Sequence, residues 1–248
     1  MNAKKNMKLS TKHESTDFME REKFEDRRKA YYAYLEWLKN QNISIEDFLH
    51  NSAAYVGDKQ IHRMLTIYEL YKQTIGLAGH IAEIGVFKGA GSLLFAKLVK
   101  VFEPEAFTIV HGFDWFCGKS SNDSKNAMIS YKNDYEKIVE LKSKQLLDGI
   151  LKIHRINIIN ECKSFFEKSP QLKFKLVFCD IASYDVMKAA IPIFWEHLLP
   201  NGIMIFDHYS LQNSPGETIA LDEILPNVVV RTIPNSWTPN AYIIKGVD

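Results

Sequence analysis

The segment HIAEIGVFKGAGSLLFAKL, residues 80–98, decides the fold of this chain. Its first five residues predict a short, mostly apolar strand that ends at Gly85. Gly89 and Gly91 then lead into an apolar run with helical spacing. A strand, a tight glycine turn and a helix in this order predict the first unit of a parallel sheet.

The same alternation repeats along the rest of the chain. Further strands are predicted at residues 107–113, 150–156, 176–180 and 202–207. Helical stretches separate them, especially at 134–147 and 186–198. Two more β-rich runs, 228–233 and 241–245, have no helix between them and predict an antiparallel pair at the C-terminal edge. The sequence thus predicts an α/β fold, with a Rossmann-like, mostly parallel sheet and helices on both faces.

The first part of the chain differs from this pattern and predicts a helical N-terminal extension. Tyr34 and Leu38 fall at helical spacing, and residues 61–71 give a second apolar helical face. We therefore expect an extension or cap at residues 1–78 and a Rossmann-like domain at residues 79–248.

Composition and charge narrow the possible partners and compartment. Lys and Arg number 31 against 30 Asp and Glu, so the balance of charge does not favour a nucleic-acid partner. Apolar runs such as 198–206 end well before the ~20 residues that a membrane span needs, and residues 1–14 lack the features of a secretory signal. Cys117, Cys162 and Cys179 lack CxxC spacing and are expected to be reduced, structural thiols. A cytoplasmic protein without membrane association is the expectation.

The turn after the first predicted strand has the chemistry of a cofactor site. Gly85 and Gly89 let a ligand approach the backbone, and the helix that begins near Ser92 offers free N–H groups to an anion. The spacing is not the G-x-G-x-x-G of dinucleotide sites, and Glu83 would repel a pyrophosphate. S-adenosylmethionine fits better, because its ammonium can meet Glu83 and its carboxylate can meet amides such as that of Val86.

Asp114 and Trp115 follow the second predicted strand. An acid in that position can accept hydrogen bonds from both hydroxyls of an adenosine ribose. The Trp115 ring can pack against the adenine. Glu83 or Asp114 taken alone is equally consistent with an ordinary loop carboxylate, but their placement on adjacent strand ends favours a cofactor pocket.

Several segments together carry a family resemblance. They are residues 81–92, 113–118, 177–198, 198–209 and 216–223. Through them the chain resembles the class I methyltransferases, and more narrowly the macrocin O-methyltransferase type, from about Tyr55 to its end. The resemblance implies methyl transfer from S-adenosylmethionine to a hydroxyl of a sugar or related natural product.

In that family, strand four ends in two alternating acids followed by a tyrosine, and strand five ends in paired acids that form a divalent metal site. Asp180 and Tyr184 match the first acid and the tyrosine, whereas Ala182 replaces the second acid, which is the family's proposed general base. Asp207 matches the first of the paired acids. His208 replaces the second.

Asp180, Asp207 and His208 therefore predict a divalent cation site, for magnesium or, because of the imidazole, a softer metal. Such a metal would bind and activate the acceptor hydroxyl. Alternatively, His208 is the general base itself, since an imidazole pKa of ~6.5 suits proton removal at neutral pH. We predict Asp180 and His208 as catalytic residues, with Asp180 also contacting the cofactor. A set of satisfied polar residues at a strand end is the third alternative.

Two other functions stay open at this level. Loss of the acid at Ala182 is also consistent with a non-catalytic protein that binds a nucleotide-like ligand. A nicotinamide-dependent oxidoreductase is less favoured, because its glycine fingerprint is missing. The predicted partner is a small-molecule acceptor, a sugar or sugar nucleotide, and a homo-oligomer is a further expectation. The polar run 118–124 predicts either a lid over the site or a plain surface loop.

Overall fold

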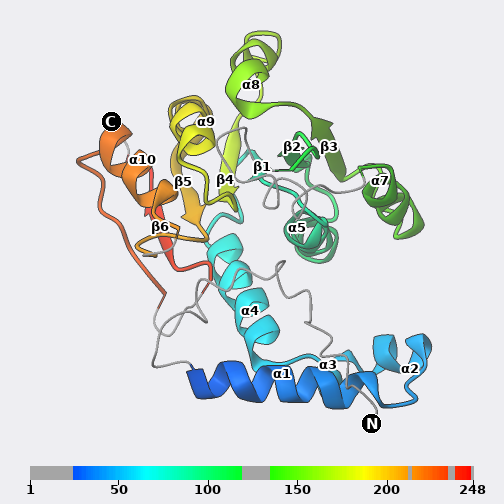
Figure 1. Ribbon diagram of the computed structural model, residues 1–248. Coiled ribbons are helices and arrows are strands. Elements are labelled where there is room, and N and C mark those ends of the chain that lie inside the picture. Colours follow the sequence, from blue (N-terminus) through cyan, green and yellow to red (C-terminus); the bar gives the residue numbers. More distant parts are fainter. Residues whose placement is uncertain (1–24, 119–134, 212–213, 234–237, 247–248) are drawn as a thin grey trace.

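The computed structural model describes residues 25–118, 135–211, 214–233 and 238–246. Within these ranges it contains a six-stranded sheet with the order β3-β2-β1-β4-β5-β6 and helices on both faces (Figure 1). The strands are β1 (His80–Ile84), β2 (Val110–Asp114), β3 (Leu151–Arg155), β4 (Phe174–Cys179), β5 (Leu198–Phe206) and β6 (Ala241–Ile244). The first five are parallel to one another, and β6 is antiparallel to β5. This arrangement confirms the predicted Rossmann-like sheet.

Helices cover the two faces of the sheet in different sets. One set comprises α8 (Ile158–Glu167), α9 (Tyr184–His197) and α10 (Gly216–Ile224). The opposite face is covered by α4 (Asp58–Lys72) and α5 (Ala90–Phe102). Next to α5, the helix α7 (Tyr135–Lys144) forms a separate small hydrophobic cluster with the turn after β1. The sheet is thus a middle layer between two helical layers.

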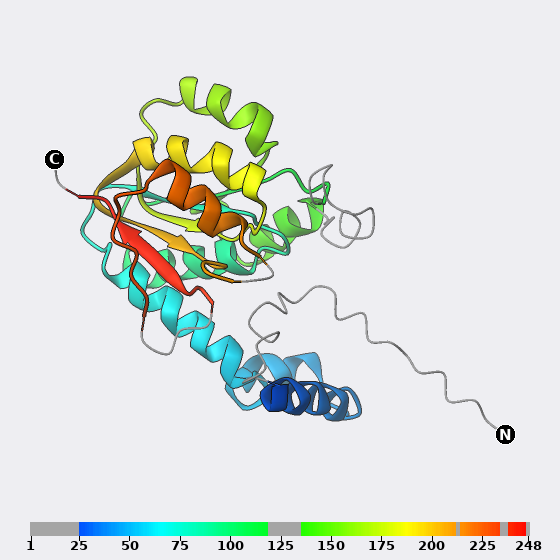
Figure 2. The same ribbon diagram turned by 60° about the vertical axis from the view of Figure 1, so that its left-hand side comes forward.

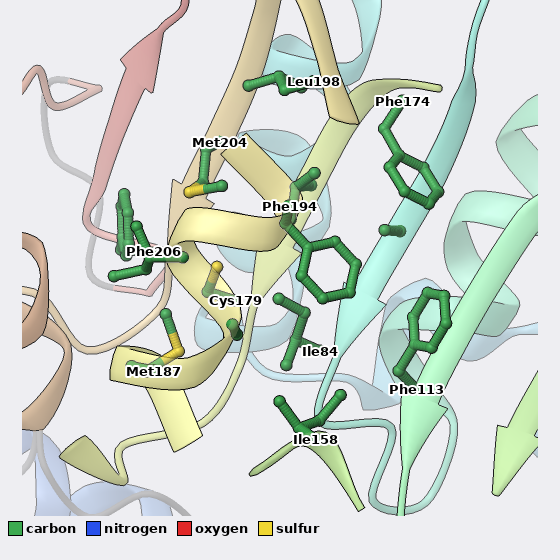
Figure 3. Packing of buried hydrophobic residues seen from close by; sticks show 14 of the residues in the cluster. Ile84, Phe113, Ile158, Phe174, Cys179, Met187, Phe194, Leu198, Met204 and Phe206 are labelled. Carbon is green, nitrogen blue, oxygen red and sulfur yellow. The ribbon is translucent and has the colours of Figure 1, made fainter. Parts of the chain in front are cut away.

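The alternation of side chains along each strand explains how both faces are filled. In β1, Ala82 and Ile84 belong to the α8–α10 side, while Ile81 belongs to the α4–α5 side. Figure 3 shows Phe194 of α9 facing Ile84 and Phe113 on the α8–α10 side of the sheet. All six residues of β4 are buried, as expected for a central strand of a parallel sheet.

The N-terminal helices form an arm that is joined to the sheet through α4. They are α1 (Glu25–Lys39), α2 (Ile45–His50) and α3 (Ser52–Tyr55). Figures 1 and 2 both show these helices away from the sheet, at the far end of α4. In α4 itself, Ile67, Leu70 and Tyr71 are buried against the sheet, whereas Met64 and Leu65 are exposed. The second half of α4 is therefore part of the core of the sheet domain.

The C-terminal antiparallel pair differs in its partners from the one predicted. Residues 228–233 form no strand and contribute a single bridge, from Arg231 to Tyr242. The full ladder of β6 is with β5, where Tyr242 lies opposite Ile205. The physical reason is that β5 offers the unpaired backbone groups of a sheet edge, while Val229 in the expected partner is 69% exposed.

Other boundaries also move. β2 begins at Val110 rather than at Phe107, which is 96% exposed, and β5 begins at Leu198 rather than at Gly202. The predicted lid lies, apart from Gly118, outside the described residues. No helix within the described parts of the chain has the length and apolar character needed to cross a membrane.

Candidate active site

The predicted site residues converge at the carboxyl ends of four strands in the middle of the sheet. The chain proceeds outward from β1 through β2 to β3, and then returns to the other side of β1 with β4 and β5. The gap between β1 and β4 is the point where strand order reverses, which is where open α/β sheets bind ligands. Glu83, Asp114, Asp180 and Asp207 lie at the ends of β1, β2, β4 and β5.

The turn after β1 needs glycine at two positions. Gly85 has a φ of +93°, and a Cβ there would lie 2.5 Å from the backbone oxygen of Asp180. Gly91, in the first turn of α5, lies so close to the Glu83 carboxylate that a Cβ would overlap it. These glycines bring the β1 turn, the α5 N-terminus and the β4 end together around one acid, Glu83.

Glu83 is a buried acid with the charge pattern expected for binding a cation. It is 1% exposed, and its carboxylate accepts a short hydrogen bond from the Ser92 hydroxyl. Burial raises the pKa of Glu83 to about 8, although the Ser92 hydroxyl opposes this. An ammonium group delivered by a ligand would offset the cost of keeping the carboxylate ionised. This observation fits the predicted contact with the amino group of S-adenosylmethionine.

Asp114 is held by backbone amides from two strand ends. Its Oδ2 accepts hydrogen bonds from the N–H groups of Val86 and Phe87, both at 3.0 Å, and its Oδ1 accepts from Phe116 N at 2.7 Å. Burial raises its pKa, while these amides lower it. Because a carboxylate oxygen can accept more than one hydrogen bond, these amides do not exclude ribose hydroxyls as further donors to Asp114. Ribose binding stays a prediction. The Val86 amide is already bonded to Asp114, and Trp115 Nε1 donates to the backbone oxygen of Gly118.

The structure brings Asp180, Asp207 and His208 together. One potential ligand atom from each lies within 4.8 Å of the others. Asp207 and His208 are buried, and Asp180 is the more exposed acid. Tyr184 does not join this group, because its hydroxyl donates to Glu223 Oε2 at 2.7 Å on the surface.

Arg63 of α4 reaches the same place. Its Nη2 lies 2.9 Å from Asp180 Oδ2, and its Nη1 makes a short ion pair with Asp207 Oδ1. Nη1 also donates to Thr238 Oγ1 at 3.1 Å, and Cζ lies 5.3 Å from the centre of the Phe178 ring. Burial lowers the pKa of Arg63, but the two carboxylates raise it above its ordinary value.

Glu217 of α10 forms a second pair with His208. This acid is fully buried and accepts the backbone N–H of His208 at 2.7 Å, with Nδ1 at 3.3 Å from its other oxygen. On the opposite side of the ring, Nε2 lies 3.7 Å from Asp207 Oδ2. Burial lowers the pKa of His208, but Glu217 and Asp207 outweigh it and raise that pKa to about 10. Burial raises the pKa of Glu217 to about 7, against the effect of His208.

The family resemblance places Arg63 in the N-terminal segment that folds over the cofactor and acceptor, but nothing in the sequence spacing placed it in the catalytic set or singled out Glu217. Arg63 is 117 residues from Asp180 along the chain, and no local spacing connects the two. Glu217 lies in residues 216–223, which carried the family resemblance without a chemical role. For Arg63 and for Glu217, the signal available in the sequence was a polar residue on the buried face of a helix.

The donor set of the predicted metal site suits a divalent cation, but a cation already lies against its two acids. Asp180 Oδ2 and Asp207 Oδ1 are both bonded to the Arg63 guanidinium. A metal bound to the same oxygens would lie within a few ångströms of that fixed positive charge, and the two would repel. A metal at this cluster stays a prediction, and Arg63 would compete with it for the same two acids.

Comparisons with known proteins agree with the fold. A family described as a methyltransferase domain matches residues 82–209, which is more than half of the chain. No curated protein sequence matches. The crystal structure of CalS11, a calicheamicin methyltransferase, is similar with a TM-score of 0.76 and 21% identity, over 90% of this chain and 93% of that one.

Two further solved structures are similar. An apo structure of CalS11, described as TDP-rhamnose 3'-O-methyltransferase, has a TM-score of 0.73 and 22% identity, over 90% and 95% of the two chains. The O-methyltransferase NovP has a TM-score of 0.63 and 18% identity, over 75% and 81%. The domain match decides among the functions left open by the sequence: the chain belongs to the methyltransferase family, and S-adenosylmethionine is its methyl donor.

Proposed function

We propose that this protein transfers the methyl group of S-adenosylmethionine to a hydroxyl of a small polar acceptor, a sugar or sugar nucleotide. One observation carries the proposal: Asp180, with its neighbours Asp207 and His208, shares a strand edge with the cofactor acids Glu83 and Asp114. A donor pocket and an ionisable acceptor pocket are therefore neighbours. The acceptor named for CalS11, TDP-rhamnose, supports a sugar nucleotide as the first class to test.

The donor side of the proposal uses Glu83, Asp114 and Trp115. Glu83 binds the amino group of the donor, which compensates its buried charge. Asp114 accepts hydrogen bonds from the ribose hydroxyls while it holds the β1 and β2 turns. Trp115 packs against the adenine. The donor supplies an electrophilic methyl group, and these contacts orient it toward the ends of β4 and β5.

On the acceptor side, Asp180 receives the proton. It is the most exposed of the three clustered groups, so an acceptor hydroxyl reaches it first. Burial and Asp207 raise its pKa to about 6 against the effect of Arg63, so Asp180 is more basic than an ordinary carboxylate. His208 retains its own proton between Glu217 and Asp207, so we assign it to holding Asp207. Much of the rate then comes from placing the two reactants at ~3 Å in line.

The donor site is tested by isothermal titration with S-adenosylmethionine, S-adenosylhomocysteine and NADH. We expect the two adenosyl ligands to bind and NADH not to bind. Asp114→Ala should weaken adenosyl binding, whereas Asp148→Ala, which changes an exposed carboxylate, should leave it unchanged. Methyl transfer is then screened with TDP-sugars and UDP-sugars. Binding of NADH instead of the adenosyl ligands, or turnover with none of the hydroxyl acceptors, would contradict the proposal.

A further inference from the structure

The position of Arg63 follows from the way α4 meets the sheet. Ile67, Leu70 and Tyr71 bury one face of this helix against the core. Arg63 lies four residues before Ile67, so it shares that face one turn earlier. There the helix has reached the carboxyl ends of β4 and β5, where Arg63 contacts Asp180 and Asp207. The packing of α4 thus fixes Arg63 at the strand ends.

Four partners hold the guanidinium in one orientation. Asp180 and Asp207 each accept from a different terminal nitrogen, Thr238 Oγ1 accepts a third bond, and the Phe178 ring lies against the group. A planar guanidinium suits two carboxylates because its donors form a fixed fork. An arginine also stays charged at any working pH. Arg63 therefore supplies a permanent positive charge between the two acids.

We propose that Arg63 is the resident cation of this site and takes the place that a divalent metal would occupy between Asp180 and Asp207. A metal between the two acids needs an oxygen of each at about 2.0–2.2 Å, and Arg63 already binds one oxygen of each, Asp180 Oδ2 and Asp207 Oδ1. Thr238 Oγ1 accepts from Nη1, the nitrogen that also binds Asp207, and the Phe178 ring lies against the guanidinium. Arg63 is thus a positioning residue, and the wild-type chain binds no divalent ion at these acids.

The inference deepens the proposed function without depending on turnover. If Arg63 is the resident cation, it fixes the Asp180 carboxylate that receives the acceptor proton. Methyl transfer should then be insensitive to EDTA. Direct metal binding tests the placement of Arg63 in the absence of donor and acceptor, so its failure can be told apart from failure of the proposed reaction.

The experiment is a Mn²⁺ titration followed by electron paramagnetic resonance, with the full chain and the metal alone. Wild type and an Arg231→Met control, changed at an exposed arginine, should leave the Mn²⁺ signal free. Arg63→Met should bind one equivalent at least tenfold more tightly than wild type. The double variant Arg63→Met/Asp207→Asn should lose that binding, which shows that the ion occupies the vacated position.

Tight, stoichiometric binding of Mn²⁺ by wild type, lost in Asp207→Asn and not improved in Arg63→Met, would overturn the inference. The wild-type titration needs no variant, so the test stands even where Arg63→Met does not fold. Circular dichroism of each variant checks folding. A second readout is single-turnover methyl transfer by wild type in EDTA, where an unchanged rate supports the inference and a rate restored only by added Mg²⁺ contradicts it.

Discussion

At the residue scale, Asp180 and His208 have separable roles. Asp180→Asn keeps the shape of the side chain but removes the proposed proton acceptor, so we expect kcat to fall by ~10²–10⁴. His208→Gln removes a group that holds Asp207 from behind and should cause a smaller loss. Steady-state kinetics of both variants, with Kd for S-adenosylhomocysteine measured in parallel, provides the test. A larger loss in His208→Gln than in Asp180→Asn would make His208 the base.

A second residue-scale prediction concerns two stacked imidazoles away from the site. His111 Nδ1 and His154 Nε2 lie 2.9 Å apart, and burial lowers the pKa of His111 to about 3 and that of His154 to about 4. Below pH 6.5 these two histidines take up protons in the unfolded chain but stay neutral in the folded chain. The free energy of unfolding should therefore fall as the pH drops from 6.5 to 4, by about 1.4 kcal/mol per pH unit for each ring.

Urea titrations across this pH window check the effect. His111→Asn should reduce the slope of unfolding free energy against pH relative to wild type, since one of the two proton-excluding rings is gone. His50→Asn, at an exposed position in α2, serves as the control and should keep the wild-type slope. Equal slopes in wild type and His111→Asn would show that the ring is protonated in the folded state.

At the element scale, α4, α5 and β4 meet at a buried ion pair. It lies at the amino end of β4, opposite the end that carries the site. Lys175 is fully buried and contacts Glu103 at 2.7 Å, and Tyr71 donates to the same acid. Lys175→Met leaves Glu103 without its cation, so we expect a loss of ~3–5 kcal/mol in unfolding free energy. Chemical denaturation of Lys188→Met gives the control, because its pair with Glu223 is exposed to solvent and should contribute little to stability. Similar losses in both variants would contradict the argument.

The helices and strands also show which parts of the fold could be predicted from sequence patterns. The unit at residues 80–98 predicted β1 and α5 correctly, because the period of apolar residues and the glycine turn are local signals. Of the predicted pair of 228–233 with 241–245, only the antiparallel bridge from Arg231 to Tyr242 forms, and the full ladder of β6 is with β5, because composition does not reveal the open edge of β5. The convergence of Asp180, Asp207 and His208 could be predicted, because parallel strands bring their carboxyl ends to one edge.

At the scale of the whole molecule, the site depends on contacts between distant parts of the chain. Arg63 reaches Asp207 across 144 residues, and its place depends on the angle at which α4 meets the sheet. Helical periodicity indicates which face of α4 is apolar but not which strand ends that face will meet. Glu217 is only nine residues from His208 along the chain, but the two meet because α10 packs on α9 and the sheet. The contacts of Arg63 and Glu217 with the strand-end residues are the part of the site that spacing in the sequence could not provide.

Binding at this edge should stabilise the entire fold, because β1, β2, β4 and β5 all contribute to the site. A ligand at ~100 times its Kd adds ~2.7 kcal/mol to the unfolding free energy. For a chain of this length each kcal/mol moves Tm by ~2–4 °C, so S-adenosylhomocysteine should raise Tm by ~5–10 °C. Differential scanning calorimetry measures this shift against the Tm of each ligand-free protein. Asp114→Ala should show little shift at the same concentration, because the ribose contact is gone. If NADH gave a shift as large as that of S-adenosylhomocysteine, the edge would be a general nucleotide site and the assignment of Glu83 to an ammonium group would fail.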